Sequence, residues 1–275
     1  MKLCTWILAA LLIAGCIHVP TAADRTQRAL AMAKQAGWHQ QIIATDRFDL
    51  AAFTPQHPVK TDTLIVYIEG DGLAWISRST PSTDPTPVHP LALQLALREP
   101  EAAVYLAHPC QYAKDAQKRN CSAKYWAGYR FAPEVIHAEN EAVDKLKQQS
   151  GASRLVLVGY SGGGGTAALI AAKRKDVVYL VTIAGNLDTA AWANLHRISP
   201  LTGSLNPADF WQALQYIPQT HYVGEQDRTV PPAVARSYAA RFPPEHQPVI
   251  VVLPGFDHHC CWANAWHGVS KPPHP

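Results

Sequence analysis

Apolar residues in this chain gather in short, nearly continuous runs. Residues 64–68 read Leu-Ile-Val-Tyr-Ile and are followed by a polar, glycine-rich loop. Similar runs occupy residues 48–53, 103–107, 155–158, 177–183, 220–223 and 249–253. Apolar runs of this length are typical of strands that are buried on both faces of a sheet. We therefore predict a strand at each of them.

Segments with helical spacing separate most of these runs. In residues 134–149, Val135, Ala138, Ala142 and Leu146 fall on one stripe of a helix. Helices are also predicted at residues 25–38, 91–98, 166–174 and 233–242. Alternating strands and helices imply right-handed crossovers and a mostly parallel sheet with helices on both faces. The pattern predicts an α/β fold whose ligand site lies at the carboxyl ends of the strands.

Residues 186–218 interrupt this alternation. Trp192, His196, Phe210, Trp211 and Tyr216 stand there among Pro and Gly, without the pattern of a strand. We expect this stretch to form a small cap insertion over the sheet, within a single domain that covers residues 25–275.

The composition agrees with one large folded domain. Of the 275 residues, 48% are hydrophobic and 16% are charged, below the roughly 25% of an average protein. The length excludes a small disulfide scaffold. The net charge is only +3, and Lys and Arg are scattered, so we expect no nucleic-acid partner.

The N-terminus has the features of a targeting segment. Lys2 precedes an apolar run over residues 3–14, which is too short to span a bilayer, and the run ends in Leu-Ile-Ala-Gly-Cys16. This ending resembles the lipobox of bacterial lipoproteins. The resemblance implies a signal peptide over residues 1–15, lipidation of Cys16 and a tether over residues 16–24. The alternative is an ordinary signal peptide with a chance cysteine.

The same resemblance implies a place in the cell. The protein would be anchored to the bacterial cell envelope through its N-terminal lipid and would face the periplasm. Ile17 follows the cysteine, whereas retention in the inner membrane usually requires Asp there, so the outer membrane is favoured. No other segment offers about 18 consecutive apolar residues, so no transmembrane span is expected.

The strand at residues 155–158 leads into Gly159-Tyr160-Ser161-Gly162-Gly163 and then into a predicted helix. Small residues on both sides of Ser161 permit a sharp turn that exposes its hydroxyl. The amide of Gly162 would begin the helix and could donate to a developing oxyanion. A phosphate-binding glycine loop is the alternative, but the Lys-Ser/Thr ending of a P-loop is missing.

This strand, turn and helix resembles the nucleophile elbow of the α/β-hydrolase superfamily, and the resemblance extends over residues 46–262. It implies that Ser161 is a nucleophile and that an acid and a histidine follow it in the chain. The turn from Gly224 to Pro231 resembles the one that carries the acid, which makes Asp227 the predicted acid and Glu225 its rival. Asp227 could instead only cap a helix.

The last predicted strand ends in Pro254-Gly255-Phe256-Asp257-His258-His259, where the superfamily places its histidine. We predict His258 as the base. Adjacent side chains of an extended chain point to opposite sides, so only one of the two histidines can face Ser161. His259 remains the alternative.

The superfamily takes its second oxyanion donor from the loop after the strand at residues 64–68. Many relatives have His-Gly there, whereas this chain has Glu69-Gly70-Asp71-Gly72. The amide of Asp71 is the best positional match, and that of Gly72 is second. We expect the Asp71 carboxylate to point away, because a negative charge would oppose an oxyanion. The alternative is a turn that uses Asp and Gly only for their backbone preferences.

Four cysteines remain once the signal peptide, with Cys4, and the lipidated Cys16 are set aside: Cys110, Cys121, Cys260 and Cys261. They could pair in three ways in an oxidising compartment. We favour Cys110 with Cys121, which leaves two adjacent cysteines whose trans Cα spacing of about 3.8 Å is short for a disulfide. Crossed pairings stay open. The adjacent His and Cys residues lack the separated pairs of zinc sites, so no metal is predicted.

These features predict a serine hydrolase that cleaves an ester-type acyl bond of a small-molecule substrate, with no cofactor. A peptidase or thioesterase of the same mechanism is one alternative. A non-catalytic envelope binding or scaffold lipoprotein on the same fold is another. The sequence does not indicate an oligomeric state.

Overall fold

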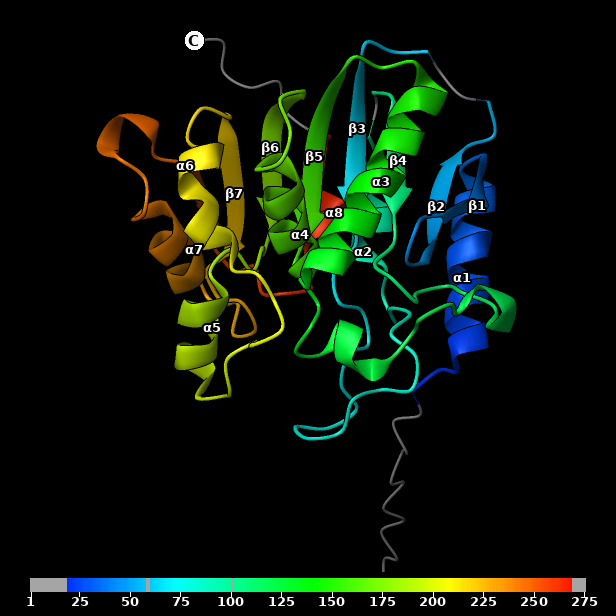
Figure 1. Ribbon diagram of the computed structural model, residues 1–275, viewed down its shortest axis with the longest axis horizontal. Coiled ribbons are helices and arrows are strands. Elements are labelled where there is room, and N and C mark those ends of the chain that lie inside the picture. The colour runs from blue at the N-terminus through cyan, green and yellow to red at the C-terminus, as the bar shows by residue number, and fades with distance from the viewer. Residues whose placement is uncertain (1–18, 58–59, 100, 269–275) are drawn as a thin grey trace, which may run out of the picture.

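The computed structural model describes residues 19–57, 60–99 and 101–268, so the predicted signal peptide and the start of the predicted tether, with Cys16, lie outside the described residues. An eight-stranded sheet in the order β1-β2-β4-β3-β5-β6-β7-β8 forms its centre (Figure 1). The strands are β1 Trp38–Ala44, β2 Asp49–Pro55, β3 Thr63–Ile68, β4 Ala103–Leu106, β5 Arg154–Tyr160, β6 Val177–Ile183, β7 Gln219–Gly224 and β8 Val249–Leu253. In this order, all neighbours from β4 to the last strand, β8, are parallel to each other. β2 is antiparallel to both of its neighbours, β1 and β4.

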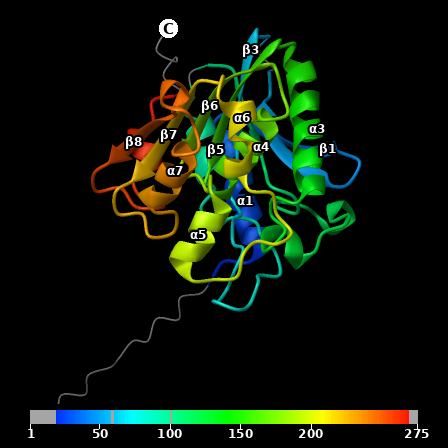
Figure 2. The ribbon, with the colours of Figure 1, turned by 60° about the vertical axis from the view of Figure 1, so that its left-hand side comes forward.

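Helices cover both faces of this sheet (Figures 1 and 2). They are α1 Ala22–Gln35, α2 Leu91–Ala96, α3 Pro133–Ser150, α4 Gly162–Ala171, α5 Thr189–His196, α6 Trp211–Leu214, α7 Pro232–Ala239 and α8 Trp262–Ala265. Short 3₁₀ turns occupy Asp115–Gln117, Ala123–Trp126, Pro207–Phe210 and Pro244–His246. The strands and helices thus alternate from β3 onwards as the hydrophobic pattern predicted.

The side chains of β3 show how the two layers of core arise. Leu64, Val66 and Ile68 belong to a buried cluster that includes residues of α3 and α4. Ile65 and Tyr67 point to the other face, into a cluster with residues of α1, α2 and α8. A strand alternates its side chains between faces, so an apolar run on β3 supplies both cores.

One strand was missed by the sequence analysis. The helix predicted at residues 25–38 is wrong at both ends, because α1 begins at Ala22 and ends at Gln35. Gly37, with φ +73°, then turns the chain into β1, which pairs with β2. β1 lies at the edge of the sheet and is largely half-exposed, so it lacks the apolar run that identified the central strands.

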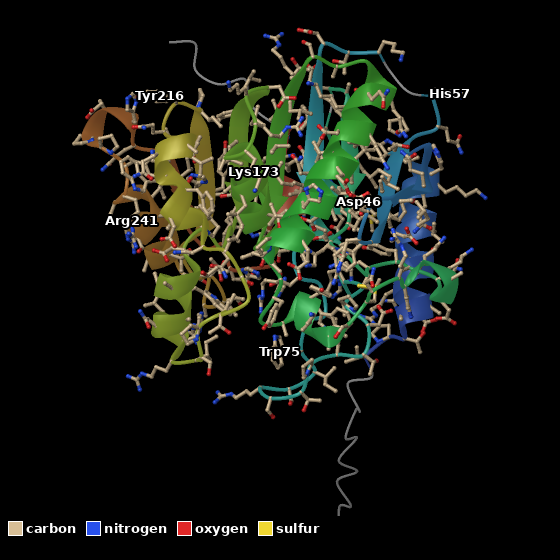
Figure 3. All side chains as sticks on the ribbon, in the orientation of Figure 1. Asp46, His57, Trp75, Lys173, Tyr216 and Arg241 are labelled. Carbon is tan, nitrogen blue, oxygen red and sulfur yellow. A yellow bond between two sulfur atoms is a disulfide. The ribbon has the colours of Figure 1, made fainter. Side chains whose placement is uncertain are left out.

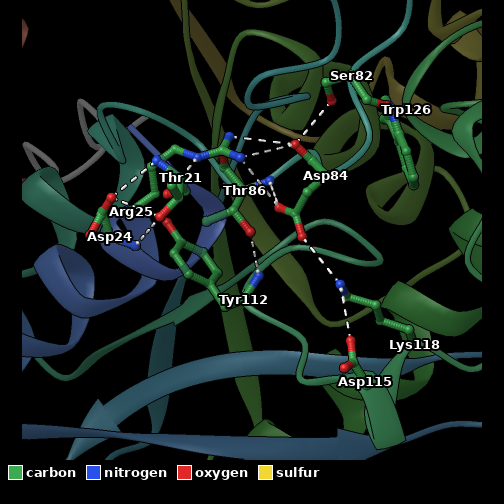
Figure 4. A network of polar contacts seen from close by, with 10 residues as sticks. All are labelled: Thr21, Asp24, Arg25, Ser82, Asp84, Thr86, Tyr112, Asp115, Lys118 and Trp126. Carbon is green, nitrogen blue, oxygen red and sulfur yellow. Dashed lines mark hydrogen bonds and ion pairs between the residues drawn. The ribbon is translucent and has the colours of Figure 1, made fainter. Parts of the chain in front are cut away.

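The N-terminus of α1 is fastened to a loop that follows β3 (Figure 4). Thr21 and Asp24 form a capping box on the first turn of the helix. The buried Arg25 donates to the carbonyls of Asp84 and Thr86 and forms an ion pair with the Asp84 carboxylate. The start of the described chain is therefore held beside residues 82–86.

The cysteines pair in the favoured way. Cys110 and Cys121 form a disulfide with a Cα–Cα distance of 5.7 Å. Cys260 and Cys261 form the second disulfide, and the peptide bond between them is cis, whereas the sequence analysis assumed a trans bond.

Residues 186–218 connect β6 to β7 and contain α5, a 3₁₀ turn and α6. Ser204 ties this segment to the loop before α3, because its hydroxyl donates to the carbonyl of Gly128 and accepts from the amide of Phe131. Within the described ranges, every helix is too short or too polar to cross a membrane.

Candidate active site

Ser161 lies on a sharp turn between β5 and α4, with φ 53° and ψ −119°. This backbone conformation is rare for a residue with a side chain. Its neighbours explain the glycines around it. A Cβ at Gly159 would overlap the carbonyl of Gly163, and a Cβ at Gly163 would overlap the carbonyls of Ile68 and Glu69. The turn therefore requires glycine at both positions.

The structure brings three of the predicted residues together. His258 Nε2 lies 3.0 Å from Ser161 Oγ, and His258 Nδ1 lies 2.8 Å from Asp227 Oδ2. The other oxygen of Asp227 accepts the amides of Thr229 and Val230, each at 2.8 Å. An ionised carboxylate only accepts, so Nδ1 of His258 carries the proton and Nε2 is free to accept the serine proton.

The two rival residues lie elsewhere. Glu225 is exposed, and only its backbone amide is anchored, to the carbonyl of Leu253. His259 lies beside the serine loop, but its Nδ1 is 3.1 Å from the hydroxyl of Tyr160 and not on Ser161. Burial and the neighbouring His258 lower the pKa of His259. Neither rival occupies the position of His258 or Asp227.

Tyr160, the residue before Ser161, was missed by the sequence analysis. Its buried hydroxyl donates to the backbone carbonyl of His258 at 3.0 Å, and the same oxygen is the partner of His259 Nδ1. The carbonyl can only accept, so the tyrosine proton points to it and His259 donates to the tyrosine oxygen. Tyr160 thereby fixes the backbone that carries His258. Its place in the Gly-x-Ser motif is the variable one, so the pattern gave no reason to select it.

Two backbone amides belong to segments that adjoin Ser161. Gly162 is the first residue of α4, and the first amides of a helix have no partner within it. A Cβ at Gly70 would lie 3.1 Å from Ser161 Cβ, which shows how closely the loop after β3 approaches the serine. The amide of Asp71 has no hydrogen-bond partner among the described residues. Gly70, whose amide donates to Glu69 Oε1, is not free in this way.

The orientation of that loop is set by Gln111, which is 1% exposed. Its Nε2 donates to the carbonyl of Gly70 at 2.8 Å, and its Oε1 accepts the amide of His108 at 3.2 Å. The carbonyl of Gly70 and the amide of Asp71 belong to one planar trans peptide, so they point in opposite directions. Holding the carbonyl therefore aims the Asp71 amide.

The side chain of Asp71 does not point away from this site as expected. A Cβ at Gly162 would overlap the Asp71 carboxylate, so the acid packs against the start of α4. Arg130, which is buried, forms an ion pair with Asp71 Oδ2, while Oδ1 is buried with no partner among the described residues. The Arg130 guanidinium therefore balances the negative charge of the Asp71 carboxylate, which we had expected to point away from the site.

A second buried pair lies behind Gln111. His108 Nδ1 is 2.8 Å from Glu139 Oε1, and His108 Nε2 is 3.0 Å from the carbonyl of Tyr125. Burial opposes a charge on the imidazole, but the Glu139 carboxylate outweighs it and raises the pKa of His108. Both ring nitrogens of His108 thus have a partner, and its contact with Glu139 favours the protonated ring.

Glu69 replaces the histidine of many superfamily members, and its side chain is buried. Its carboxylate accepts the amide of Gly70 at 3.0 Å and the hydroxyl of Tyr105 at 3.3 Å, and the amides of Ala92 and Leu93 at the start of α2 also bind it. Burial raises the pKa of Glu69 to about 7. Glu69 thus joins the loop to α2 and does not face Ser161.

A cavity of about 400 Å³ opens above Ser161. Its walls include Trp75 and Val88 from the loops after β3, Trp192 from α5, and Arg130. The indole of Trp192 donates to the carbonyl of Thr229 at 2.7 Å, and the Arg130 guanidinium lies 5.5 Å from its ring centre. The segment predicted as a cap therefore contributes a wall of the cavity through Trp192. The sequence offered no spacing that selects these residues.

The described residues offer one group of possible metal ligands, away from this cavity. Ligand atoms of Asp46, His137 and Glu141 lie within 4.8 Å of one another. Cys260 and Cys261 are bonded to each other, so they do not provide thiolates beside His258.

Comparisons with solved structures identify the fold. Est1E from Butyrivibrio proteoclasticus is similar at 15% identity, with a TM-score of 0.55 and coverage of 80% of this chain and 90% of that chain. An α/β serine hydrolase homologue from Coxiella burnetii has 16% identity, a TM-score of 0.51 and coverage of 80% and 88%. The esterase domain of a Rhodothermus marinus protein has 13% identity, a TM-score of 0.54 and coverage of 84% and 93%.

No family model and no curated protein matches the chain. At such low identities the similar structures establish the fold alone. The protein has the α/β-hydrolase fold, which confirms the predicted fold class.

The buried Glu69 generates a testable pH dependence. Its pKa is raised in the folded state, so between about pH 4.5 and about pH 7 the folded protein keeps a proton that the unfolded chain releases. Glu69 therefore contributes a fall in the free energy of unfolding as the pH rises through this range. We expect Glu69→Gln to remove about 3 kcal/mol of this fall.

Denaturant unfolding at pH 5 and pH 8 would measure the effect, with Glu245→Gln at an exposed site as the matched control. Equal pH dependence in the wild type and in Glu69→Gln would contradict it.

Proposed function

We propose that this protein is a serine hydrolase that cleaves ester-type acyl bonds at the bacterial cell envelope. The observation that carries the proposal is the continuous hydrogen-bond chain from Asp227 through His258 to Ser161, at the floor of a cavity. Two of the similar structures are described as an esterase domain and a serine hydrolase homologue, which supports the reaction class.

The geometry suits acyl transfer to water. His258 Nε2 removes the proton of Ser161 while Oγ attacks the ester carbonyl, and the Asp227 carboxylate stabilises the resulting imidazolium. The amides of Gly162 and Asp71 donate to the oxyanion of the tetrahedral intermediate. When it collapses, His258 gives its proton to the departing alcohol and an acyl-enzyme remains.

Hydrolysis then reverses these roles. His258 takes a proton from water, which attacks the acyl carbon, and a second tetrahedral intermediate releases the carboxylic acid and restores the Ser161 hydroxyl. Every proton transfer passes through His258, so the orientation of this side chain affects each step. No step needs a group from outside the chain other than water.

The proposed envelope location rests on the amino-acid sequence of residues 1–18. The apolar run over residues 3–14 and the Leu-Ile-Ala-Gly-Cys16 ending support cleavage before Cys16 and its lipidation. A lipid at that position would hold the domain at a membrane surface.

A nucleophile probe tests the serine and its base. We expect a fluorophosphonate to label the wild-type chain and not Ser161→Ala. His258→Ala should slow labelling by about a hundredfold or more, the usual scale for loss of a general base, and His259→Ala by much less. Labelling of Ser161→Ala, or greater loss in His259→Ala than in His258→Ala, would contradict the assignment.

Measuring kcat and KM for ester substrates shows whether Gln111 orients the Asp71 amide or binds the substrate. Gln111→Met keeps the volume of the side chain but loses the donor to Gly70, so the Asp71 amide is no longer aimed. Because that amide acts on the transition state, kcat should fall about 10- to 100-fold while KM changes little.

Gln94→Met, on the surface of α2, is the matched control for this substitution. A rise in KM at unchanged kcat would assign Gln111 to substrate binding instead.

Intact-mass spectrometry tests the proposed cleavage before Cys16 and its lipidation. The intact mass of protein isolated from membranes should correspond to a chain that starts at Cys16 and carries acyl groups, and Cys16→Ser should abolish the addition. An unmodified thiol at Cys16 would refute the anchor.

A further inference from the structure

We propose that the face at the carboxyl ends of the strands rests on a lipid bilayer, and that the cavity takes esters of amphiphiles held in that bilayer. The first part concerns docking and uses the lipid anchor proposed at Cys16. The second part rests on the proposed function. We call this surface the mouth face and define it by two tips, residues 73–82 after β3 and residues 189–200 around α5.

Each tip exposes large apolar side chains. In the first, Trp75 is 40% and Ile76 is 60% exposed, and in the second, Leu195 is 51% and Ile198 is 46% exposed. Both tips project beyond the carboxyl ends of the strands, at the lower edge of the views in Figures 1 and 2. Trp75 is labelled there in Figure 3. Isoleucine and leucine exposed on two separate projections are costly in water and are useful at an interface.

The charges on the tips have one sign. Residues 73–82 and 189–200 contain no Asp or Glu, and each includes one arginine, Arg78 or Arg197, both exposed. Apolar side chains beside arginine, without acids, match the boundary between acyl chains and anionic headgroups.

The chain enters the domain on the same face. Arg25 holds the first turn of α1 against Asp84 and Thr86, two and four residues beyond the first tip (Figure 4). Val19, where the described chain begins, is 45% exposed. In the proposed mature chain, which begins at Cys16, the lipid-bearing residue therefore precedes Val19 by three positions, on the side of the cavity mouth and not at the opposite end.

A short connection then limits the orientation. Cys16 and Val19 are three residues apart, a span of at most about 10 Å. A domain of this size has a radius of gyration of roughly 18 Å, so a lipid on Cys16 could not place the far end of the sheet on the membrane. The tether favours contact through the mouth face.

The cavity connects this face to the nucleophile. Trp75 comes from one tip and Trp192 from the other, and both line the cavity above Ser161. An acyl chain could pass from the bilayer between the two tips without crossing water. The substrate class that fits is an amphiphile whose ester lies near the headgroups.

Fluorescence quenching tests docking without any turnover. Full-length Ser161→Ala, isolated from membranes, is placed in vesicles of phosphatidylethanolamine and phosphatidylglycerol with and without brominated acyl chains. We expect bromine to quench tryptophan emission, with a large part of the quenching lost in Trp75→Phe and retained in the matched control Trp211→Phe. Equal quenching in both variants would overturn the proposal.

Turnover tests the second part. Ile76→Asp, Leu195→Asp and Ile198→Asp are combined in the full chain, since none of these residues lines the cavity. Hydrolysis of a vesicle-held ester should fall about tenfold or more, because three apolar anchors are lost, while a water-soluble short ester is hydrolysed as before. The control combines Tyr216→Asp and Val249→Asp, exposed positions away from the mouth face, and should change neither rate (Figure 3 labels Tyr216).

The outcomes separate the two proposals. Quenching through Trp75 in a protein that hydrolyses neither ester would retain docking and refute the proposed function. Hydrolysis of both esters without quenching through Trp75 would support the proposed function and refute docking. If the tips cover each other in two copies of the chain, lipid-free protein would sediment as a dimer that the three aspartates abolish, which would overturn the bilayer assignment.

Discussion

Backbone atoms of β3, of the turn after β5 and of the loop after β3 crowd closely around Ser161. The carbonyls of Ile68 and Glu69 lie where a side chain on Gly163 would be, and Gly70 lies almost against Ser161. This close approach of β3 to β5 brings the Asp71 amide to the serine. Any side chain on these glycines would push the loop away and separate the Asp71 amide from Ser161.

The sequence predicted what depends on local pattern. The central strands are apolar runs, and the residues of the hydrogen-bonded chain each follow a strand end in an order that the superfamily resemblance implied. β1 was not predicted, because this edge strand contains polar residues and lacks a continuous apolar run. The predicted direction of the Asp71 carboxylate was wrong, because it depends on Arg130, 59 positions away in the chain.

Most of the site residues that the sequence pattern did not predict act through hydrogen bonds between residues far apart in the chain. Gln111 holds Gly70 across 41 positions, and Tyr160 holds the His258 backbone across 98. Neither residue has a motif, since each is selected only by the position of a carbonyl in the folded chain. The buried pair of His108 and Glu139 belongs to the same group, because its partners meet only when α3 packs on the sheet.

The hydrogen bond from Tyr160 to the His258 carbonyl also bears on motion at the margin of the sheet. His258 follows β8, an outer strand with partly exposed side chains, where fraying is easiest. Tyr160 stands next to Ser161 on a buried central strand. This bond couples thermal motion of the loop after β8 to the buried strand β5. Ser161 and His258 are therefore expected to move together, which keeps the distance between Oγ and Nε2 nearly constant.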